Sequence, residues 1–288
     1  TIITGEHKER YSNKYKHYEE AGVLLQELLE GTEYIVNLVV LDGVSKCTAI
    51  WKYDKRPYNG APFVCYSKKL MALGDEDCLA DILEYTQGVI TSLGFCNGAL
   101  HAEVMYVPNR GPVLVEMNCR LHGGNAQWVV PAEICMGYSQ LSVFMDAYMN
   151  HGEGQFRSVP AEPTTKFAGC YQVKMRSHVE GPLEDVIPSQ LVRIQSLKSY
   201  HSHWFTVKPG DMILKTRDMP SVPGEVTLIH EDNDQLESDY KTLNDILHEG
   251  IFLVRTASTF AIPSTLGVSA PDNLSVNSAA ASALIPTI

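Results

Sequence analysis

The stretch GPVLVEMNCRLHGG, residues 111–124, constrains the fold more than any other part of the sequence. Its polar residues Glu116, Asn118 and Arg120 recur at every second position between apolar ones. A β-strand directs alternate side chains to opposite faces, so this stretch predicts a strand with one apolar face and one polar face. A carboxylate, an amide and a guanidinium in a row on one face indicate a site that binds a ligand.

The preceding strand is expected to pair with this one as a hairpin, because the intervening residues 108–111 have the turn sequence PNRG. If the loop closes symmetrically, Glu103 faces Glu116 and His101 faces Asn118. Like charges directly opposite each other destabilise an antiparallel pair by up to about 1 kcal/mol. Burial against apolar neighbours would raise that cost further.

A divalent cation between the two carboxylates would remove this repulsion. Glu103, Glu116 and Asn118 offer carboxylate and amide oxygens, which suit a hard cation such as Mg²⁺. Two alternatives stay open at this point. One carboxyl group could be protonated and hydrogen-bonded to the other, or a bulge could shift the register so that the two acids never meet.

Composition narrows the class of protein. The 288 residues are 44% hydrophobic, which is enough for one large or two medium domains with a core. A net charge of −11 argues against a nucleic-acid partner. The sequence has neither a run of about 18 apolar residues nor a signal-peptide pattern, so no membrane partner is expected. Because it opens at Thr1 in polar sequence, we expect an excerpt of a longer chain.

Cysteine usage indicates the compartment. The seven cysteines are scattered singly, without a C-x-x-C pair. This pattern predicts reduced, buried thiols in a cytoplasmic protein, and it argues against a zinc site.

Residues 23–155 alternate strands and helices. Asp42-Gly43 is a strong signal for a two-residue hairpin turn. Apolar residues at helical spacing from Leu79 to Leu93 predict a helix that stops at Gly94. A second hairpin over 99–120 and a helix over 141–150 follow.

Residues 161–254 have a different texture and predict a smaller, mostly β lobe. Four stretches read as strand-like, 164–175, 191–200, 203–207 and 224–230, and one helix is expected over 234–250. The last segment, 256–288, is rich in Ser, Ala, Thr and Pro without periodicity, so we expect a disordered tail. The predicted fold class is α+β.

The combination of Glu103 with the Glu116-x-Asn118-x-Arg120 run, preceded by LLQELLEGTEYIVNLVVLDG at 24–43, resembles the C-terminal half of the ATP-grasp fold. It is most similar to the carboxylate–amine ligases, which include L-amino acid ligases. The resemblance covers about 23–150. It implies an antiparallel sheet flanked by helices, the ATP-grasp core (23–155), followed by the smaller β-rich lobe, and it implies that 1–22 is a remnant of the small nucleotide-covering subdomain.

The resemblance also implies a division of roles among the polar residues. Glu103, Glu116 and Asn118 would be the ligands of Mg²⁺, with Mn²⁺ as an alternative ion. Arg120 would be catalytic, stabilising the transition state in which an acyl phosphate forms.

A second group would bind ATP. The backbone of the linker QELL, which is Gln26, Glu27, Leu28 and Leu29, would meet the adenine edge. Glu33 would hold the ribose hydroxyls. The basic residues Lys52, Lys55 and Arg56 would contact triphosphate or substrate. Two alternatives weigh against these roles. Symmetric closure around Asp42-Gly43 would make Glu33 and Lys52 a cross-strand ion pair, and basic runs are usually solvated charge clusters.

The function that the resemblance implies is an ATP-dependent carboxylate–amine ligase. It would form an amide or peptide bond through an acyl phosphate and release ADP and phosphate. The partners would be a small carboxylate and an amine, both expected to be amino acids, and a homodimer is a further expectation. The alternative is a truncated, non-catalytic ATP-grasp module with weak nucleotide binding or an interaction role. The sequence favours that alternative in one respect, because it shows no strand ending in Lys-Pro and no glycine-rich flap.

Overall fold

The structure is a computed structural model that describes residues 25–151, 154–163 and 166–255. The remnant predicted at 1–22 and the tail predicted at 256–288 lie outside the described residues. Within the described ranges no helix is long and apolar enough to cross a membrane.

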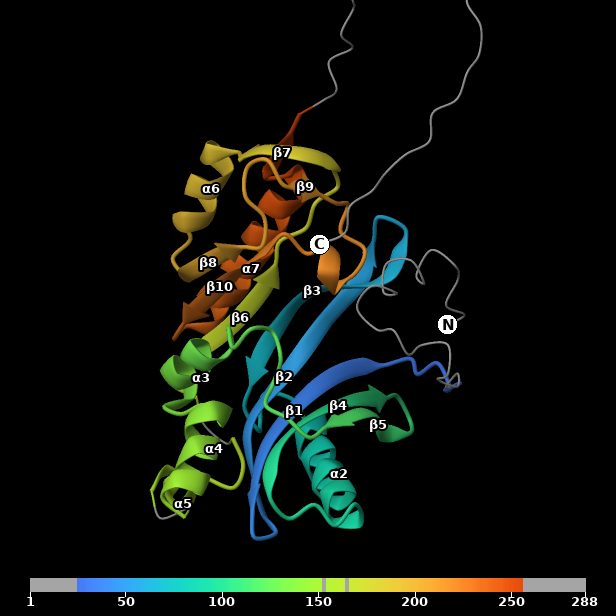
Figure 1. The fold of residues 1–288 in the computed structure, drawn as a ribbon, viewed down its shortest axis with the longest axis vertical. Helices are drawn as coiled ribbons and strands as arrows, with labels where there is room; N and C mark the ends of the chain where they lie inside the picture. The colour runs from blue at the N-terminus through green and yellow to red at the C-terminus, as the bar shows by residue number, and fades with distance from the viewer. Residues whose placement is uncertain (1–24, 152–153, 164–165, 256–288) are drawn as a thin grey trace, which may run out of the picture. The chain divides into compact units, whose positions relative to one another are not determined.

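Eleven strands and six α-helices make up the described residues (Figure 1). The strands are β1 (Thr32–Leu41), β2 (Val44–Tyr58), β3 (Ala61–Met71), β4 (Gly98–Val107), β5 (Gly111–Asn118), β6 (Gly169–Lys174), β7 (Gly181–Val186), β8 (Tyr200–Phe205), β9 (Met212–Ile213), β10 (Gly224–His230) and β11 (Phe252–Val254). The helices are α2 (Cys78–Ser92), α3 (Val129–Met136), α4 (Gln140–Met149), α5 (Gln155–Ser158), α6 (Pro188–Gln195) and α7 (Asn233–Glu249), with a 3₁₀ turn at Met219–Ser221.

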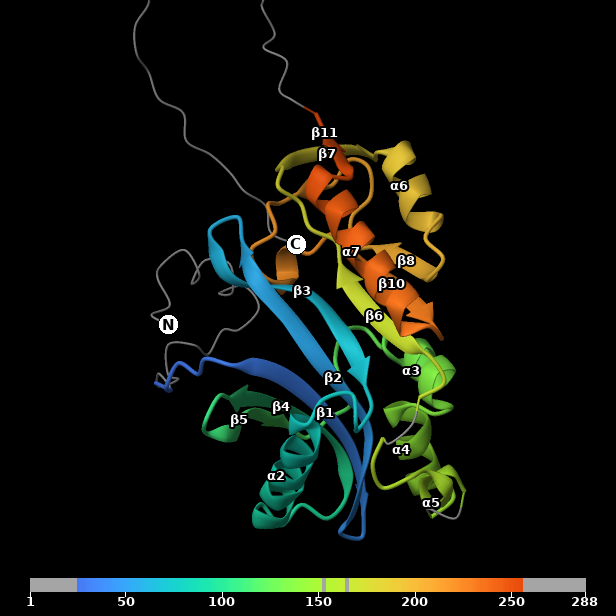
Figure 2. The same ribbon diagram turned by 180° about the vertical axis from the view of Figure 1, so that it is seen from behind.

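One antiparallel sheet of eight strands runs through this part of the chain in the order β5-β4-β1-β2-β3-β6-β10-β8 (Figures 1 and 2). The antiparallel sheet flanked by helices, predicted from the sequence, is confirmed. The pairing of β3 with β6 joins the strands of 23–155 to those of 161–254 in a single sheet. A separate three-stranded sheet has the order β11-β7-β9.

Two tight turns connect the first three strands. The hairpin predicted at Asp42-Gly43 is present, and both residues have positive φ, 50° and 80°. Asn59-Gly60 forms a second turn of the same kind, with φ of 47° and 81°. This turn was not predicted, because the run around it was considered only for its basic residues. Positive φ at both turn positions favours Asn-Gly and Asp-Gly, so the signal was present.

The hairpin of β4 and β5 reaches the predicted register by an unexpected route. Its loop closes with Val107 opposite Gly111, which is one residue away from symmetric closure. A bulge in β5, at Val115, then shifts the pairing back by one residue, so that Glu103 faces Glu116. Beyond the bulge His101 faces Asn118, as predicted.

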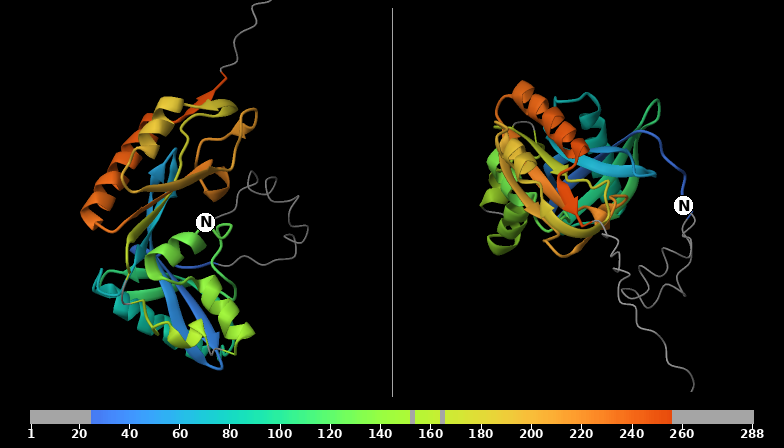
Figure 3. Two further views of the ribbon diagram at one scale, coloured as in Figure 1. Left: turned by 90° about the vertical axis from the view of Figure 1, so that its left-hand side faces the viewer. Right: turned by 90° about the horizontal axis from the view of Figure 1, so that it is seen from above.

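Helices cover both faces of the β1–β2–β4 part of the sheet. Helix α2 packs Leu79, Ile82 and Leu83 against one face, as its periodicity predicted. Leu93, which was expected on the same helix face, lies past the end of α2 and is 64% exposed. The opposite face is covered by α3 and α4, and Figures 1 and 3 show these helices across the sheet from α2.

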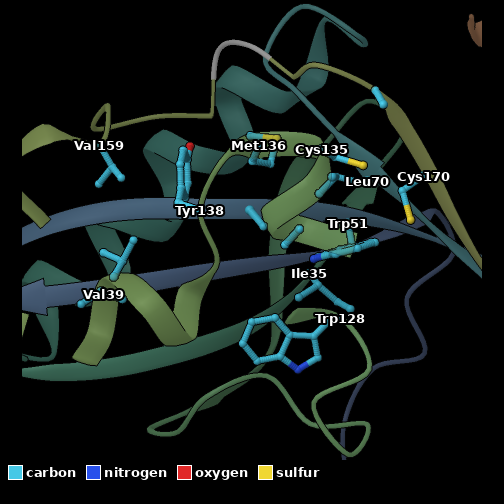
Figure 4. Packing of buried hydrophobic residues seen from close by; sticks show 14 of the residues in the cluster. Ile35, Val39, Trp51, Leu70, Trp128, Cys135, Met136, Tyr138, Val159 and Cys170 are labelled. Carbon is cyan, nitrogen blue, oxygen red and sulfur yellow. The ribbon is translucent and has the colours of Figure 1, made fainter. Parts of the chain in front are cut away.

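The core on the α3–α4 side contains Trp51 and Trp128, both almost fully buried (Figure 4). Both tryptophans are therefore core residues. The prediction of buried thiols holds for Cys47, Cys65, Cys135 and Cys170, whereas Cys96 and Cys119 are exposed and Cys78 is intermediate. Each of the seven is a free cysteine.

The 166–255 part packs one face of β6 and β10 against α7, the helix predicted over 234–250. The prediction for 191–200 is wrong over most of its length, because 188–195 form helix α6. Pro188 occupies the first turn of α6, where its missing N–H costs nothing, and Ile194 is buried. The strand begins only at Tyr200.

Candidate functional site

A cavity of about 800 Å³ opens between the start of β1 and helix α7. Its wall includes six of the predicted ATP-binding residues, Arg56 among them, and residues of 166–255. The cavity is lined by Leu28, Leu29, Glu30, Gly31, Thr32, Glu33, Lys52, Tyr53, Asp54, Lys55, Arg56, Phe63, Ser67, Lys69, Glu76, Met105, Tyr171, Glu237 and Tyr240. The structure therefore brings residues 28–33 together with Lys52, Lys55 and Arg56, which come about 20 residues later in the sequence.

The segment that precedes β1 reaches this cavity by running close to β4. A Cβ at Gly31 would lie 2.2 Å from the carbonyl oxygen of Tyr106, so only glycine fits here. Glu27, upstream, accepts hydrogen bonds from Arg110 Nη1 at 2.9 and 3.1 Å, while Gln26 is exposed. Neither Gln26 nor Glu27 lines the cavity, unlike Leu28 and Leu29.

Glu33 carries an ion pair that differs from the expected one. A bulge between β1 and β2 places Tyr34 opposite Lys52, so the alternative in which Glu33 pairs with Lys52 is wrong. Lys55 Nζ instead lies 2.6 Å from both carboxylate oxygens of Glu33. Burial raises the pKa of Glu33, the Lys55 ammonium opposes the rise, and the neighbouring Glu103 carboxyl adds to it.

Lys52 is held on another part of the cavity wall. Its Nζ donates to Glu76 Oε1 at 2.5 Å, and Tyr34 donates to Glu76 Oε2 at 2.5 Å. Burial would raise the pKa of Glu76, but these two hydrogen bonds outweigh it and the pKa lies below its ordinary value. Lys52 and Lys55 therefore both have carboxylate partners in the protein.

The two facing acids stand on the same pair of strands. Asn118 Nδ2 donates to Glu116 Oε1 at 2.6 Å, while Glu103 lies 3.5 Å from His101 Nε2 and 3.4 Å from the hydroxyl of Tyr53. Burial would raise the pKa of Glu103, but the hydrogen bond with His101 and the charge of Lys55 outweigh it. Glu103 is thus ionised at neutral pH, which disfavours the alternative of a protonated carboxyl at this position.

The donor set fits a hard divalent cation that takes further ligands from elsewhere. Glu103, Glu116 and Asn118 provide oxygen donors from neighbouring strands, and Mg²⁺ ordinarily takes one or two protein carboxylates, with waters and phosphates completing its shell. Among the described residues no group of three or more His, Cys, Asp and Glu side chains could hold a metal. A complete protein cage, such as zinc prefers, is therefore absent from that part of the chain.

Arg120 follows β5 directly. Its backbone N–H donates to Asn118 O at 2.9 Å, and its Nη1 donates to Leu121 O at 3.0 Å. Asn118 is a register partner of His101, so this bond keeps the arginine close to the end of the paired strands. The Arg120 side chain is exposed, and it forms no salt bridge with a carboxylate among the described residues.

Sequence reasoning missed a chain of buried polar side chains beside the acids. His101 Nδ1 lies 2.9 Å from Asn37 Oδ1, Asn37 Nδ2 lies 3.0 Å from His122 Nδ1, and His122 Nε2 lies 3.0 Å from Lys68 Nζ. Since His101 also contacts Glu103, polar contacts link Glu103 to Lys68 across four strands. Asn37 in an otherwise apolar strand was the available signal.

His122 is fixed on every side. Its ring stacks on Trp128 with 5.4 Å between the ring centroids. Its backbone N–H donates to Gln140 Oε1 at 2.9 Å, and its backbone carbonyl accepts from Trp128 Nε1 at 2.9 Å. Burial, together with the Lys68 charge, lowers the pKa of His122 well below its ordinary value. The imidazole is therefore neutral at pH 7, and it holds the loop that carries Arg120 in one position.

A scan against protein-family models finds no match for this chain. A curated relative, dapdiamide A synthase of Enterobacter agglomerans, is 28% identical over 224 residues, which make up 78% of this chain and 51% of the relative. The chain thus spans about half the length of that relative.

Solved structures share the fold at low sequence identity. An L-amino acid ligase from Bacillus licheniformis matches with a TM-score of 0.64 and 16% identity, over 80% of this chain and 55% of that one. A phosphoribosylglycinamide synthetase from Anaerococcus prevotii matches with a TM-score of 0.58 and 14% identity, over 88% and 61%. A carboxyaminoimidazole ribonucleotide synthase from Aspergillus clavatus, complexed with ATP, matches with a TM-score of 0.52 and 14% identity, over 78% and 52%.

Proposed function

The described residues have the fold of the ATP-grasp carboxylate–amine ligases, and from this premise we propose that the intact protein is an ATP-dependent ligase that joins a carboxylate to an amine. The observation that carries the proposal is the register of β4 and β5, which sets Glu103 opposite Glu116. Because Glu103 is ionised at neutral pH, a cation between the two acids explains an arrangement that would otherwise be repulsive.

ATP would bind in the 800 Å³ cavity. We infer that the backbone of Leu28 and Leu29, which line this cavity, meets the adenine edge and that Glu33 accepts hydrogen bonds from the ribose. Gln26 and Glu27 lie outside the cavity lining, so the adenine role that the resemblance implied for them is not carried forward. The Glu33–Lys55 pair supports the second role, since an acid already fixed by a neighbour loses little freedom on binding. Lys52 and Lys55 line the same cavity and would contact the triphosphate.

Glu103, Glu116 and Asn118 would hold Mg²⁺ or Mn²⁺. When bound, the ion would neutralise phosphate charge. The chain's own contribution is positioning: rigid strands fix the acids, and the network around His122 fixes the loop that carries Arg120. Arg120 would then meet the negative charge that grows as the substrate carboxylate attacks the γ-phosphorus.

The remaining chemistry is the aminolysis of the acyl phosphate. The C–O bond to phosphate breaks as the amine forms the new C–N bond, so the products are the amide, ADP and phosphate. Amino acids are the proposed substrates, on the strength of the sequence match to a dapdiamide synthase and the fold match to an L-amino acid ligase.

Replacing one acid tests the proposal. In the intact protein, Glu116→Gln should abolish Mg²⁺-dependent ADP release, because the amide keeps the shape of the side chain but removes its charge. The same substitution at the exposed Glu184 of β7 is the matched control and should leave the rate unchanged. Unchanged turnover in Glu116→Gln would refute the metal assignment.

Calorimetry with ATP and Mg²⁺ separates the ligase from a non-catalytic module. Micromolar binding that a chelator abolishes is the expected result. Absence of any heat would favour the module.

A further inference from the structure

Lys68 on β3 is a buried cation without a carboxylate partner among the described residues. The side chain is 5% exposed, and its Nζ lies 3.0 Å from His122 Nε2 and 5.5 Å from the centroid of the Trp51 ring. His122 is neutral, so it offers a lone pair but no charge. A buried ammonium is costly unless a negative charge accompanies it.

The groups that surround Lys68 in the described part of the chain include only one carboxylate, Glu225, and its charge is shared with a second lysine. They are Lys174 and Cys170 of β6, Glu225 of β10 and Cys65 of β3 itself. Burial raises the pKa of both thiols, so they are neutral. Glu225 is already in an ion pair with Lys174. One positive charge is left over.

Burial, reinforced by Lys174, lowers the pKa of Lys68 to about 8. Most of the Lys68 side chains are therefore still charged at pH 7. At pH 7 the protein therefore holds a charged lysine in its interior, out of contact with bulk water.

The space beside Lys68 is open and is flanked by a second cation. A Cβ at Gly124 would meet only one heavy atom within 4 Å, Lys68 Nζ at 3.9 Å. A Cβ at the adjacent Gly123 would likewise meet only Arg120 Nη1, at 3.5 Å. The two glycines thus leave room next to the ammonium and the guanidinium, where a side chain would fill it.

The backbone here adopts an uncommon conformation. Gly124, Asn125 and Ala126 have successive positive φ values of 75°, 55° and 59°. Left-handed conformations cost about 1–2 kcal/mol per residue other than glycine, and they persist where the surrounding structure enforces them, often at functional sites. The loop is therefore held open beside Lys68 at some cost.

We propose that Lys68 binds a carboxylate group of the substrate other than the one activated at Arg120. The inference rests on the proposed function, which assigns the reacting carboxylate to Arg120. Two neighbouring cations call for two anionic groups. The strands of Lys68 and Glu103 are three inter-strand spacings apart, on the order of 14 Å. A substrate can therefore react beside Glu103 while a second carboxylate reaches Lys68.

Two sources carry such a carboxylate. One is a dicarboxylic acid serving as the acid substrate, and the other is an amino acid serving as the amine, which keeps its own carboxylate. Both would place the same chemical group on Lys68.

The experiment observes Lys68 directly, without ATP. In the intact protein labelled with ¹³C at lysine Cε, the Lys68 signal is assigned by its loss in Lys68→Met and followed during titration with succinate, L-alanine, L-leucine and the amides of both amino acids. A saturable shift of Lys68 is expected, while the exposed Lys198, whose Nζ donates to Gln235, serves as the control and should not respond in a saturable way.

The response identifies the source. Saturation by the amino acids but not by their amides assigns the carboxylate to the amine substrate, and saturation by succinate alone assigns it to a dicarboxylic acid. Lys68→Met lacks the Lys68 signal, so its affinity is measured by calorimetry with the same compounds, and it should be about tenfold to a hundredfold weaker than that of the wild type because a charged hydrogen bond is lost. Lys68→Arg should retain most of the affinity.

A Lys68 signal that responds to none of these compounds overturns the inference. The outcome is separable from that of the proposed function. An intact protein that releases no ADP yet shows the saturable response refutes the ligase reaction alone. Normal ADP release with a silent Lys68 refutes the carboxylate site alone.

Discussion

Lys174 on β6 and Lys68 on β3 are both buried, and they stand on neighbouring strands of one sheet. The surrounding structure treats them in opposite ways. Lys174 pairs with Glu225, which also accepts a hydrogen bond from Gln172 at 3.1 Å. Lys68 has a neutral imidazole in place of an acid. A charge that is balanced within the protein serves the fold, whereas an unbalanced charge beside open space is suited to a ligand.

The largest expected effect is on the balanced pair. Lys174→Met should lower the free energy of unfolding by about 3–5 kcal/mol, because it leaves Glu225 buried without its counter-charge. Urea denaturation at pH 7 measures the change. The double variant Lys174→Met/Glu225→Leu is the control and should recover most of the loss, since replacing a whole buried pair by apolar residues is often neutral. A loss below about 1 kcal/mol in the single variant would remove the contrast between the two lysines.

The second effect is a pH dependence at Lys68. Its pKa is about 8 in the folded protein and near 10.5 when unfolded, so between these values the unfolded chain binds more protons. Stability attributable to Lys68 must therefore rise as pH increases from about 8 to 10.5, by about 3 kcal/mol in total. Lys68→Met should lack this rise and should be at least as stable as the wild type at pH 7.

Urea midpoints of the two proteins, compared at a series of pH values, measure this difference, and titrations common to both cancel. If the midpoints of wild type and Lys68→Met run parallel from pH 7 to 10.5, Lys68 is not an unbalanced cation. Lys198→Met, at an exposed lysine, provides the baseline.

The smallest effect separates burial from pairing. Arg193 of α6 pairs with Glu249 of α7, and both side chains are 47% exposed. Exposed ion pairs contribute little because water solvates both charges when they separate. Arg193→Gln should therefore leave the urea midpoint unchanged within measurement error. A loss comparable to that of Lys174→Met would mean that pairing, rather than burial, sets the cost.

Local patterns predicted much of the fold. Turn dipeptides and alternating strands identified the hairpins at 42–43 and 108–111, and helical spacing identified α2 and α7. The stretch that became α6 was misjudged because its few apolar residues also suit a strand, and the proline at its start was overlooked. Bulges were not predictable, since each depends on how a whole strand packs rather than on the residues at the bulge.

The candidate site was predictable only in part. Glu103 and Glu116 meet as expected, because the turn and the strands around them are local. Lys68, His122 and Asn37 lie on segments separated by tens of residues, and only the pairing of β1, β2 and β3 brings them together. The partner of Glu33 was predicted wrongly for the same kind of reason, since a single bulge exchanges Lys52 for Lys55.

The extra residue at Val115 has a consequence for how this hairpin can vary over evolution. It divides the arm into an outer tip and an inner base whose alignments are set separately. The bulge in β5 already accommodates one surplus residue. A residue lost from β5, or gained at the tip of the hairpin, can therefore be absorbed at the bulge. Lineages are thus free to remodel the tip while the acids at the base keep facing each other.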